Sequence, residues 1–181
     1  MAITSPHNAP GQKVTAPWGE YVIGVGPMSV EAFAQLSGAD GWLLELYQGR
    51  LLRMPGPGYD HAAIQSRLFE LVNPHLRANT LGRLVGTGYF VLSTGEGQAD
   101  VLCPDLSYTQ PERLAQAPRR GSYPVVAPDL VVEIVSPTDR LSDVAHKTQV
   151  YLVAGVRLIW VIWPVSQTIE VWRSATPAAP V

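Results

Sequence analysis

Three carboxylates lie in segments that have the composition of β-strands: Glu45 in LLELY, Asp105 in LCPDLSY and Glu133 in VVEIVS. An ionised carboxylate buried among valine, leucine and isoleucine is strongly destabilising unless a cation compensates it. If the strands of Asp105 and Glu133 are neighbours, their carboxylates converge at one end of a sheet and repel each other unless a hard cation lies between them. Mg²⁺, with Mn²⁺ as a substitute, suits such a pair because it keeps several waters and needs few protein ligands.

Lys147 is the candidate cationic partner of Glu133, and it is one of two lysines among 13 basic residues. Arg140, Val144, Lys147 and Tyr151 are spaced three and four residues apart, so they share one side of a predicted helix. If this helix returns antiparallel along the sheet, it brings the ammonium to Glu133. An acidic pair, a lysine and a divalent ion suit phosphodiester hydrolysis, because the ion activates water and the lysine orients the water or neutralises the oxyanion.

The elements that must position these residues alternate between strand and helix patterns. Strand patterns occur over 41–55, where a hairpin turns at Gln48-Gly49, and over 83–93, 99–109, 128–137, 156–164 and 168–173. Helical patterns occur over 28–37, 59–79 and 138–155. Ser29 and Asp60 are the candidate N-caps of the first two helices, and Pro74 is expected to kink or end the second. The predicted buried face of the second helix consists of Ile64, Leu68, Leu71 and Val72.

These patterns predict a single α/β (α+β) domain with a mixed central sheet flanked by helices, an N-terminal helix and a hairpin. We expect residues 1–26 to form a flexible arm, 27–173 the domain and 174–181 a disordered tail. Cys103 is the only cysteine, which excludes an internal disulfide and fits a reducing cytosol. No signal-peptide pattern and no apolar run of membrane-spanning length is present, so the expected location is cytoplasmic, with no membrane partner. The net charge of −2 excludes a globally basic surface but is compatible with a local groove for DNA.

Several separated segments resemble one known family. PDLVVEIVSPTDR is followed by KTQVYLVAGVRLIWVIWP and preceded by ELYQGRLLRMPGPGYDHAAIQSRL. In this order they are similar to the Uma-two family of restriction endonucleases, within the PD-(D/E)XK nuclease superfamily. The resemblance runs from about Phe33 to Trp172 and includes the CPD segment. It implies a restriction-endonuclease-like fold and a metal-dependent endonuclease that acts on DNA.

The resemblance also implies roles for individual residues. Asp105 and Glu133 correspond to the acidic pair that holds the metal, and Glu45 would assist at the entrance of the site. The superfamily pattern has a lysine two residues after the glutamate, where this chain has Val135. Within the family the lysine lies on the following helix, and Lys147 matches that position. His61 matches a histidine typical of the family and would contact the metal-bound water or the phosphate.

Each of these residues also has a structural interpretation. Asp105 can cap a turn after Pro104, Lys147 and Glu45 can be exposed, and His61 can be a helix cap. Three functions therefore stay open: an endonuclease, a nuclease-like module that binds nucleic acid or protein without cutting, and a hydrolase of RNA or another phosphodiester. Cutting both strands of a duplex needs two sites, so a homodimer is a candidate assembly.

Overall fold

The structure is a computed structural model that describes residues 20–21, 27–36, 42–93, 99–137 and 139–174. Most of the predicted flexible arm and tail lies outside these residues. Two residues of the predicted arm, Glu20–Tyr21, form strand β1. Ser174, the first residue of the predicted tail, donates its backbone N–H to the carbonyl of Arg157. No helix in the described ranges is both long enough and apolar enough to cross a membrane.

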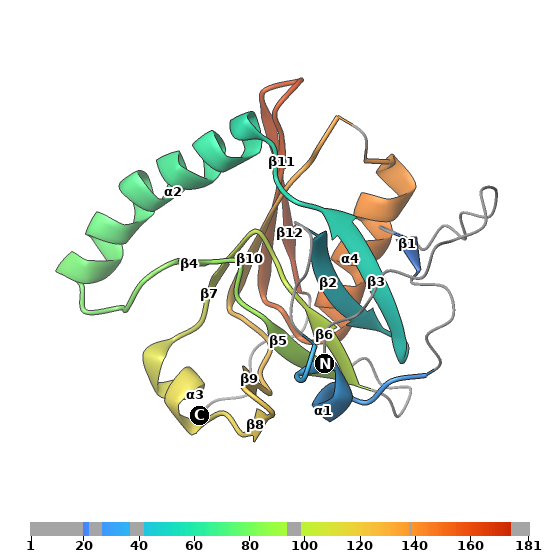
Figure 1. Cartoon of the computed structure of the whole chain (residues 1–181). Helices are drawn as coiled ribbons and strands as arrows, with labels where there is room; N and C mark the ends of the chain where they lie inside the picture. The colour runs from blue at the N-terminus through green and yellow to red at the C-terminus, as the bar shows by residue number, and fades with distance from the viewer. Residues whose placement is uncertain (1–19, 22–26, 37–41, 94–98, 138, 175–181) are drawn as a thin grey trace.

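The strands form two five-stranded sheets where the sequence predicted one (Figure 1). The first sheet is antiparallel and has the order β1, β3 (Arg50–Pro55), β2 (Trp42–Tyr47), β6 (Ala99–Leu102) and β5 (Phe90–Ser93). The second is mixed and has the order β12 (Thr168–Arg173), β11 (Leu158–Trp163), β10 (Leu130–Ile134), β7 (Leu106–Tyr108) and β4 (Val85–Gly86). Its one parallel pair is β10 with β11, among the strands described. A third sheet has two strands, β8 (Arg119–Arg120) and β9 (Tyr123–Pro124), and Val125, directly after β9, forms a bridge with Val91 of β5.

Two predicted strands are divided because the chain passes from one sheet to the other within each of them. The segment 83–93 contributes β4 to the second sheet and β5 to the first, with a positive φ of 51° at Thr87 between them. The segment 99–109 contributes β6 to the first sheet and β7 to the second. Pro104 lies at this second crossing, where it has no N–H to continue the strand ladder. Cys103, Pro104 and Asp105 therefore lie at the junction of the two sheets.

Four helices accompany the sheets in the described part of the chain: α1 (Val30–Phe33), α2 (Tyr59–Ala78), α3 (Pro111–Gln116) and α4 (Leu141–Val153). Ser29 caps α1 as predicted, because its side chain accepts the N–H of Ala32. The prediction that Asp60 caps α2 is wrong: the cap is Gly58, and Asp60 lies in the first turn, where its charge favours the helix dipole. Pro74 lies within α2 on its exposed side, where water can hydrate the carbonyl that lacks a helical donor.

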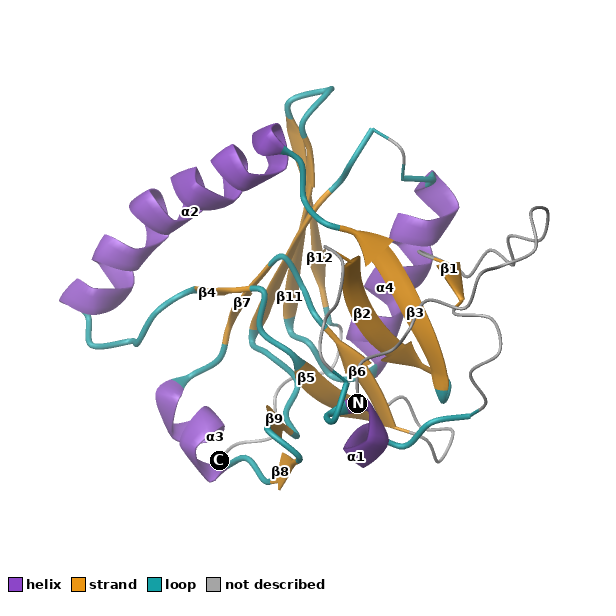
Figure 2. Ribbon diagram, in the orientation of Figure 1, coloured by secondary structure: helices purple, strands orange, loops and turns teal. Residues whose placement is uncertain are grey.

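Helices α2 and α4 lie on opposite sides of the second sheet (Figure 2), whereas the residues of its edge strand β12 are exposed. Leu130, Val132 and Ile134 of β10 pack in one core cluster with residues of α2. Val131, in contrast, packs with Val150 and Tyr151 of α4 and with residues of the first sheet. Alternation along β10 therefore directs Glu133 toward α4. On α2, Ile64, Leu68 and Val72 face the core, but Leu71 is 57% exposed, so the predicted apolar face was too wide.

Candidate active site

The strand register brings two of the predicted acids together. β7 and β10 are antiparallel neighbours, with Leu106 opposite Val132. One step further along this register, Asp105 lies opposite Glu133, and directly opposed residues project from the same face. Asp105 therefore lies directly before β7, the antiparallel neighbour of the strand that carries Glu133. The Asp105 carboxylate is fixed on both sides: Oδ2 accepts the N–H of Ile134 at 2.7 Å, and Oδ1 lies 3.0 Å from His61 Nε2.

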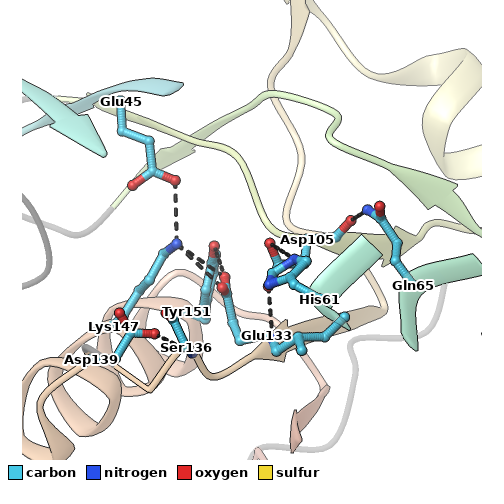
Figure 3. A network of polar contacts seen from close by, with 10 residues as sticks. Glu45, His61, Gln65, Asp105, Glu133, Ser136, Asp139, Lys147 and Tyr151 are labelled. Carbon is cyan, nitrogen blue, oxygen red and sulfur yellow. Dashed lines mark hydrogen bonds and ion pairs between the residues drawn. The ribbon is translucent and has the colours of Figure 1, made fainter. Parts of the chain in front are cut away.

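Lys147 joins the two sheets through carboxylates of each (Figure 3). Its Nζ lies 3.2 Å from Glu133 Oε1 on the second sheet and 3.4 Å from Glu45 Oε1 on the first. One helical turn further along α4, the Tyr151 hydroxyl donates to Glu133 Oε1 at 2.7 Å. The predicted contact between the helix-borne lysine and Glu133 is thus present, and the lysine side chain is only 11% exposed.

Glu45 lies at the inner end of this cluster. Its side chain is fully buried, so the expectation that Glu45 stands at the entrance of the site is wrong. Alternation along β2 directs it, like its cross-strand partner Leu52, toward the core beneath α4. Its Oε1 also accepts the backbone N–H of Cys103 at 2.8 Å. Glu45 therefore holds both the lysine and the junction between the sheets.

Burial and neighbouring charges shift the pKa values of three ionisable groups at the site. Burial raises the pKa of Glu133 to about 7; Lys147 opposes this increase, whereas the charges of Asp105 and Glu45 add to it. Burial alone would lower the pKa of Lys147, but Glu133 and Glu45 outweigh burial and raise it, so the amine stays protonated at neutral pH. The hydrogen bond to Asp105 raises the pKa of His61 against the effect of burial. Lys147 is consequently a hydrogen-bond donor and a fixed positive charge, and it cannot act as a general base.

A cavity of about 730 Å³ opens over the cluster. Its polar lining includes His61, Asp105, Glu133 and Lys147. Three further segments line it: the loop between β3 and α2 together with the first residues of α2, the segment between β10 and α4, and the turn after β11. A substrate can therefore reach the opposed carboxylates from solvent.

The donor set supports a divalent ion held mainly by water. Within the described ranges, no group of three or more His, Cys, Asp or Glu side chains is arranged to hold a metal ion. Asp105 and Glu133 nevertheless oppose each other and both line the cavity. Their carboxylate oxygens already accept hydrogen bonds, yet each carboxylate offers about four lone-pair positions. The residues therefore fit an ion such as Mg²⁺, which combines one or two carboxylates with several waters.

Three further polar residues belong to this region and were not predicted as site residues. Tyr151 binds Glu133, Gln65 donates to the carbonyl of Asp105 at 2.6 Å, and Asp139 accepts the N–H of Ser136 at 2.7 Å and lines the cavity. Spacing carried a signal for two of them: Gln65 follows His61 by one helical turn, and Tyr151 follows Lys147 in the same way.

The comparisons with known proteins agree with this fold. The model of the Uma2 family, described as "Putative restriction endonuclease", matches residues 30–179. The chain belongs to the Uma2 family. The crystal structure of a protein from Anabaena variabilis ATCC 29413, described as a "putative nuclease belonging to DUF820", is similar with a TM-score of 0.69. The two chains are 24% identical, over 83% of this chain and 82% of that one. No curated protein matches the sequence.

Membership of the Uma2 family confirms the resemblance inferred from the sequence segments, and the structural match confirms the nuclease-like α+β fold. At this level of identity the solved structure establishes the fold alone. The roles of individual residues depend on the geometry described above.

Proposed function

We propose that this Uma2-family chain is a Mg²⁺-dependent endonuclease that hydrolyses phosphodiester bonds in DNA, with Mn²⁺ able to substitute. The observation that carries the proposal is the opposed pair Asp105 and Glu133, beside the charged Lys147, at the base of a solvent-accessible cavity. The family description as restriction endonucleases supports the same reaction.

In this proposal Asp105 and Glu133 hold the metal. The bound ion would supply activation of water and stabilisation of the charge that develops on the phosphate. Lys147 provides a fixed positive charge that orients water or neutralises a phosphate oxygen, and Glu45 keeps its ammonium in place from the buried side. His61 restrains the Asp105 carboxylate and presents its imidazole to the cavity. Cutting both strands would require two sites, so a homodimer is part of the proposal.

Plasmid nicking tests the proposal. We expect nicking with Mg²⁺ or Mn²⁺, none in EDTA, and a loss of at least about a thousandfold in Glu133→Gln. Glu70→Gln is the matched control, because Glu70 is a 65% exposed carboxylate on α2 that pairs with Arg67. Parallel assays on RNA and a small phosphodiester test the substrate class. If the wild type and Glu133→Gln nicked the plasmid at the same rate with every metal, the proposal would be contradicted.

One observation favours a second candidate, a nuclease-like module that binds without cutting. The carboxylate oxygens of Asp105 and Glu133 all accept intramolecular bonds, from His61, Ile134, Lys147 and Tyr151. Calorimetric titration with Mg²⁺ separates the two functions. An enzyme should bind Mg²⁺ in a way that Glu133→Gln removes, whereas a binding module should show the same heat in both proteins.

A further inference from the structure

Strand β12 forms a long open edge of the second sheet. It pairs with β11 through six consecutive residues, without a proline or a bulge, and no strand in the described part of the chain pairs with its outer side. The other edge strands are shorter or covered: β1 and β4 have two residues each, and β5 forms a bridge with Val125. Proteins normally protect regular edges, because their unpaired backbone groups bind further strands. Among the described edges, β12 is therefore the one that a partner strand can use.

Hydrogen bonds to β11 determine which backbone groups of β12 point outward. Ser174 donates its N–H to the carbonyl of Arg157 at 3.0 Å, so these two residues form a hydrogen-bonded antiparallel pair. Such pairs alternate along the ladder, so every second residue of β12 turns its backbone toward β11. The other residues direct their N–H and C=O groups away from the sheet: Ile169, Val171 and Arg173.

Apolar side chains accompany these backbone groups on both faces of the edge. Ile169 is 54% exposed, Val171 47% and Trp172 40%. Cross-strand partners in the two core clusters place the first two on the α2 face and Trp172 on the α4 face. Glu170 and Arg173 are the charged residues of β12, one of each sign, so a strand of the same composition carries no net charge that would repel it.

A second copy of β12 complements this edge in one register. In a twofold antiparallel pair, one residue of the strand lies opposite itself. If that residue is Glu170, like charges are directly opposed, which is destabilising. If it is Val171, the outward N–H groups of each copy meet the outward carbonyls of the other along the whole strand. Glu170 then lies opposite Trp172, whose indole donates to Glu170 Oε2 at 3.3 Å within one chain. If it is Trp172, Ile169 extends beyond the end of the other β12 and loses its partner.

We propose that β12 pairs antiparallel with β12 of a second copy about Val171, so that two chains share one continuous sheet. Main-chain hydrogen bonds supply the affinity in such strand additions, and the apolar side chains on both faces add to it. The inference concerns assembly and does not rest on the proposed nuclease function.

The shared sheet also places the two candidate active sites. Glu133 is level with Val161 of β11 and, through it, with Glu170 of β12. Rotation about an axis perpendicular to the sheet keeps both copies of Glu133 on the same face, five strand spacings or roughly 24 Å apart. Each chain keeps its own cavity, so the dimer supplies the two sites that cutting of both DNA strands would require.

Sedimentation velocity over a concentration series tests the pairing. We expect the wild type to change from monomer to dimer as its concentration rises. Val171→Pro removes the central outward N–H and leaves the bonds to β11, because proline is tolerated where the N–H faces away from the sheet. It should raise the Kd of the dimer at least about tenfold. Val171→Thr is the matched control, since it keeps the N–H and a branched side chain, and it should dimerise like the wild type.

Crosslinking through a new cysteine tests the register. In the proposed pair Val171 lies opposite itself with about 5.5 Å between the Cα atoms, whereas the two copies of Ile169 are four positions apart. A short bismaleimide should therefore join Val171→Cys into dimers and leave Ile169→Cys mostly uncrosslinked. Cys103 is buried and serves in the wild type as the background control.

Three outcomes would overturn the inference. A wild type that stays monomeric at every concentration would leave β12 to another part of the chain or to a different protein. A folded Val171→Pro, judged by circular dichroism, that dimerises like the wild type would place the interface elsewhere. Equal crosslinking at positions 171 and 169 would exclude the register.

Nicking assays on the same variants distinguish this inference from the proposed function. If the wild type nicks plasmid DNA but is monomeric, the nuclease stands and the strand pairing fails. If the dimer forms through β12 but no metal supports nicking, the pairing stands and the nuclease proposal fails.

Discussion

The two ends of β10 each carry an acidic residue in an ion cluster, yet the clusters differ in charge balance. Asp129, just before the strand, accepts from Arg113 and lies 3.1 Å from Arg157 Nη1, while its second oxygen accepts the N–H of Gln110 at 2.8 Å. One carboxylate therefore faces two guanidinium groups. Asp129 therefore anchors the entry of β10.

Glu133, at the other end, belongs to a cluster with excess negative charge. It shares Lys147 with Glu45 and opposes Asp105, whose Oδ1 lies 3.0 Å from His61 Nε2. Burial does not distinguish the ends, because the side chains of Asp129 and Glu133 are 11% and 15% exposed. The difference is that the Glu133 cluster opens on the cavity and lacks compensating charge, which suits a metal ion.

Removing one cation at each end should give the largest contrast. We expect Lys147→Met to lower kcat/KM for DNA by at least about a hundredfold, because a fixed positive charge beside the substrate is lost. Arg113→Met should leave kcat/KM unchanged below its melting temperature, since Arg157 still pairs with Asp129. Steady-state cleavage assays at saturating Mg²⁺ measure both.

Lys147→Met also leaves Glu45 and Glu133 without their shared cation, and breaking a buried pair can cost about 3–5 kcal/mol. Circular dichroism must therefore show that the variant is folded at the assay temperature. Lys147→Arg retains the positive charge but replaces the ammonium by a larger, planar guanidinium group. Relative to Lys147→Met, it should recover more of the stability than of the activity. If Arg113→Met lost as much activity as Lys147→Met, the proposed difference between the two ends would be wrong.

Replacing each acid by its amide should change stability in opposite directions. In EDTA at pH 8 we expect Glu133→Gln to unfold at a higher temperature than the wild type, because burial disfavours the charged form of Glu133 and Glu45 still pairs with Lys147. Asp129→Asn should unfold at a lower temperature, since two guanidinium groups lose their carboxylate. Thermal unfolding followed by circular dichroism gives both shifts.

The effect at Glu133 should depend on pH with a defined sign. The pKa of Glu133 is about 7 in the folded protein against an ordinary value of 4.5, so the folded state binds the extra proton between these values. Wild-type stability should therefore fall as the pH rises from about 4.5 to 7. The raised pKa of His61 acts in the same direction above its ordinary value of 6.5. In Glu133→Gln the fall in stability between about pH 4.5 and 7 should disappear. If the pH dependence of stability were the same as in the wild type, Glu133 would not have a raised pKa in the folded protein.

Local sequence signals were sufficient for some of these features. The turn at Gln48-Gly49 was predicted from two residues and has φ values of 49° and 71°, as the favoured two-residue hairpin turn requires. Strand alternation predicts the face of the sheet on which Glu133 lies, and helical spacing predicts the face of α4 that carries Lys147. The contact between these two residues forms across a short sequence distance, because α4 is the helix that follows β10.

Features that depend on distant parts of the chain were predicted less well. The pattern LLELY is compatible with an exposed glutamate or a buried one, and Glu45 is buried because α4 and the second sheet, far along the chain, pack over β2. The division into two sheets likewise depends on which distant strands pair, and Pro104 was its one local sign. Tyr151 was placed on the correct helix face, but its hydrogen bond to Glu133 depends on how α4 meets the sheet.

The smallest expected contrast lies between two buried tyrosines. Tyr151 donates to Glu133 at 2.7 Å, and Tyr47 makes a hydrogen bond of 2.8 Å with His146 outside the carboxylate cluster. Tyr151→Phe and Tyr47→Phe should each lower the free energy of unfolding by about 1 kcal/mol. Tyr151 lowers the pKa of Glu133, so its removal raises that pKa. The rise of kcat/KM with pH should therefore move to higher pH in Tyr151→Phe alone. Identical pH profiles in the two variants would show that the ionisation of Glu133 does not control the reaction.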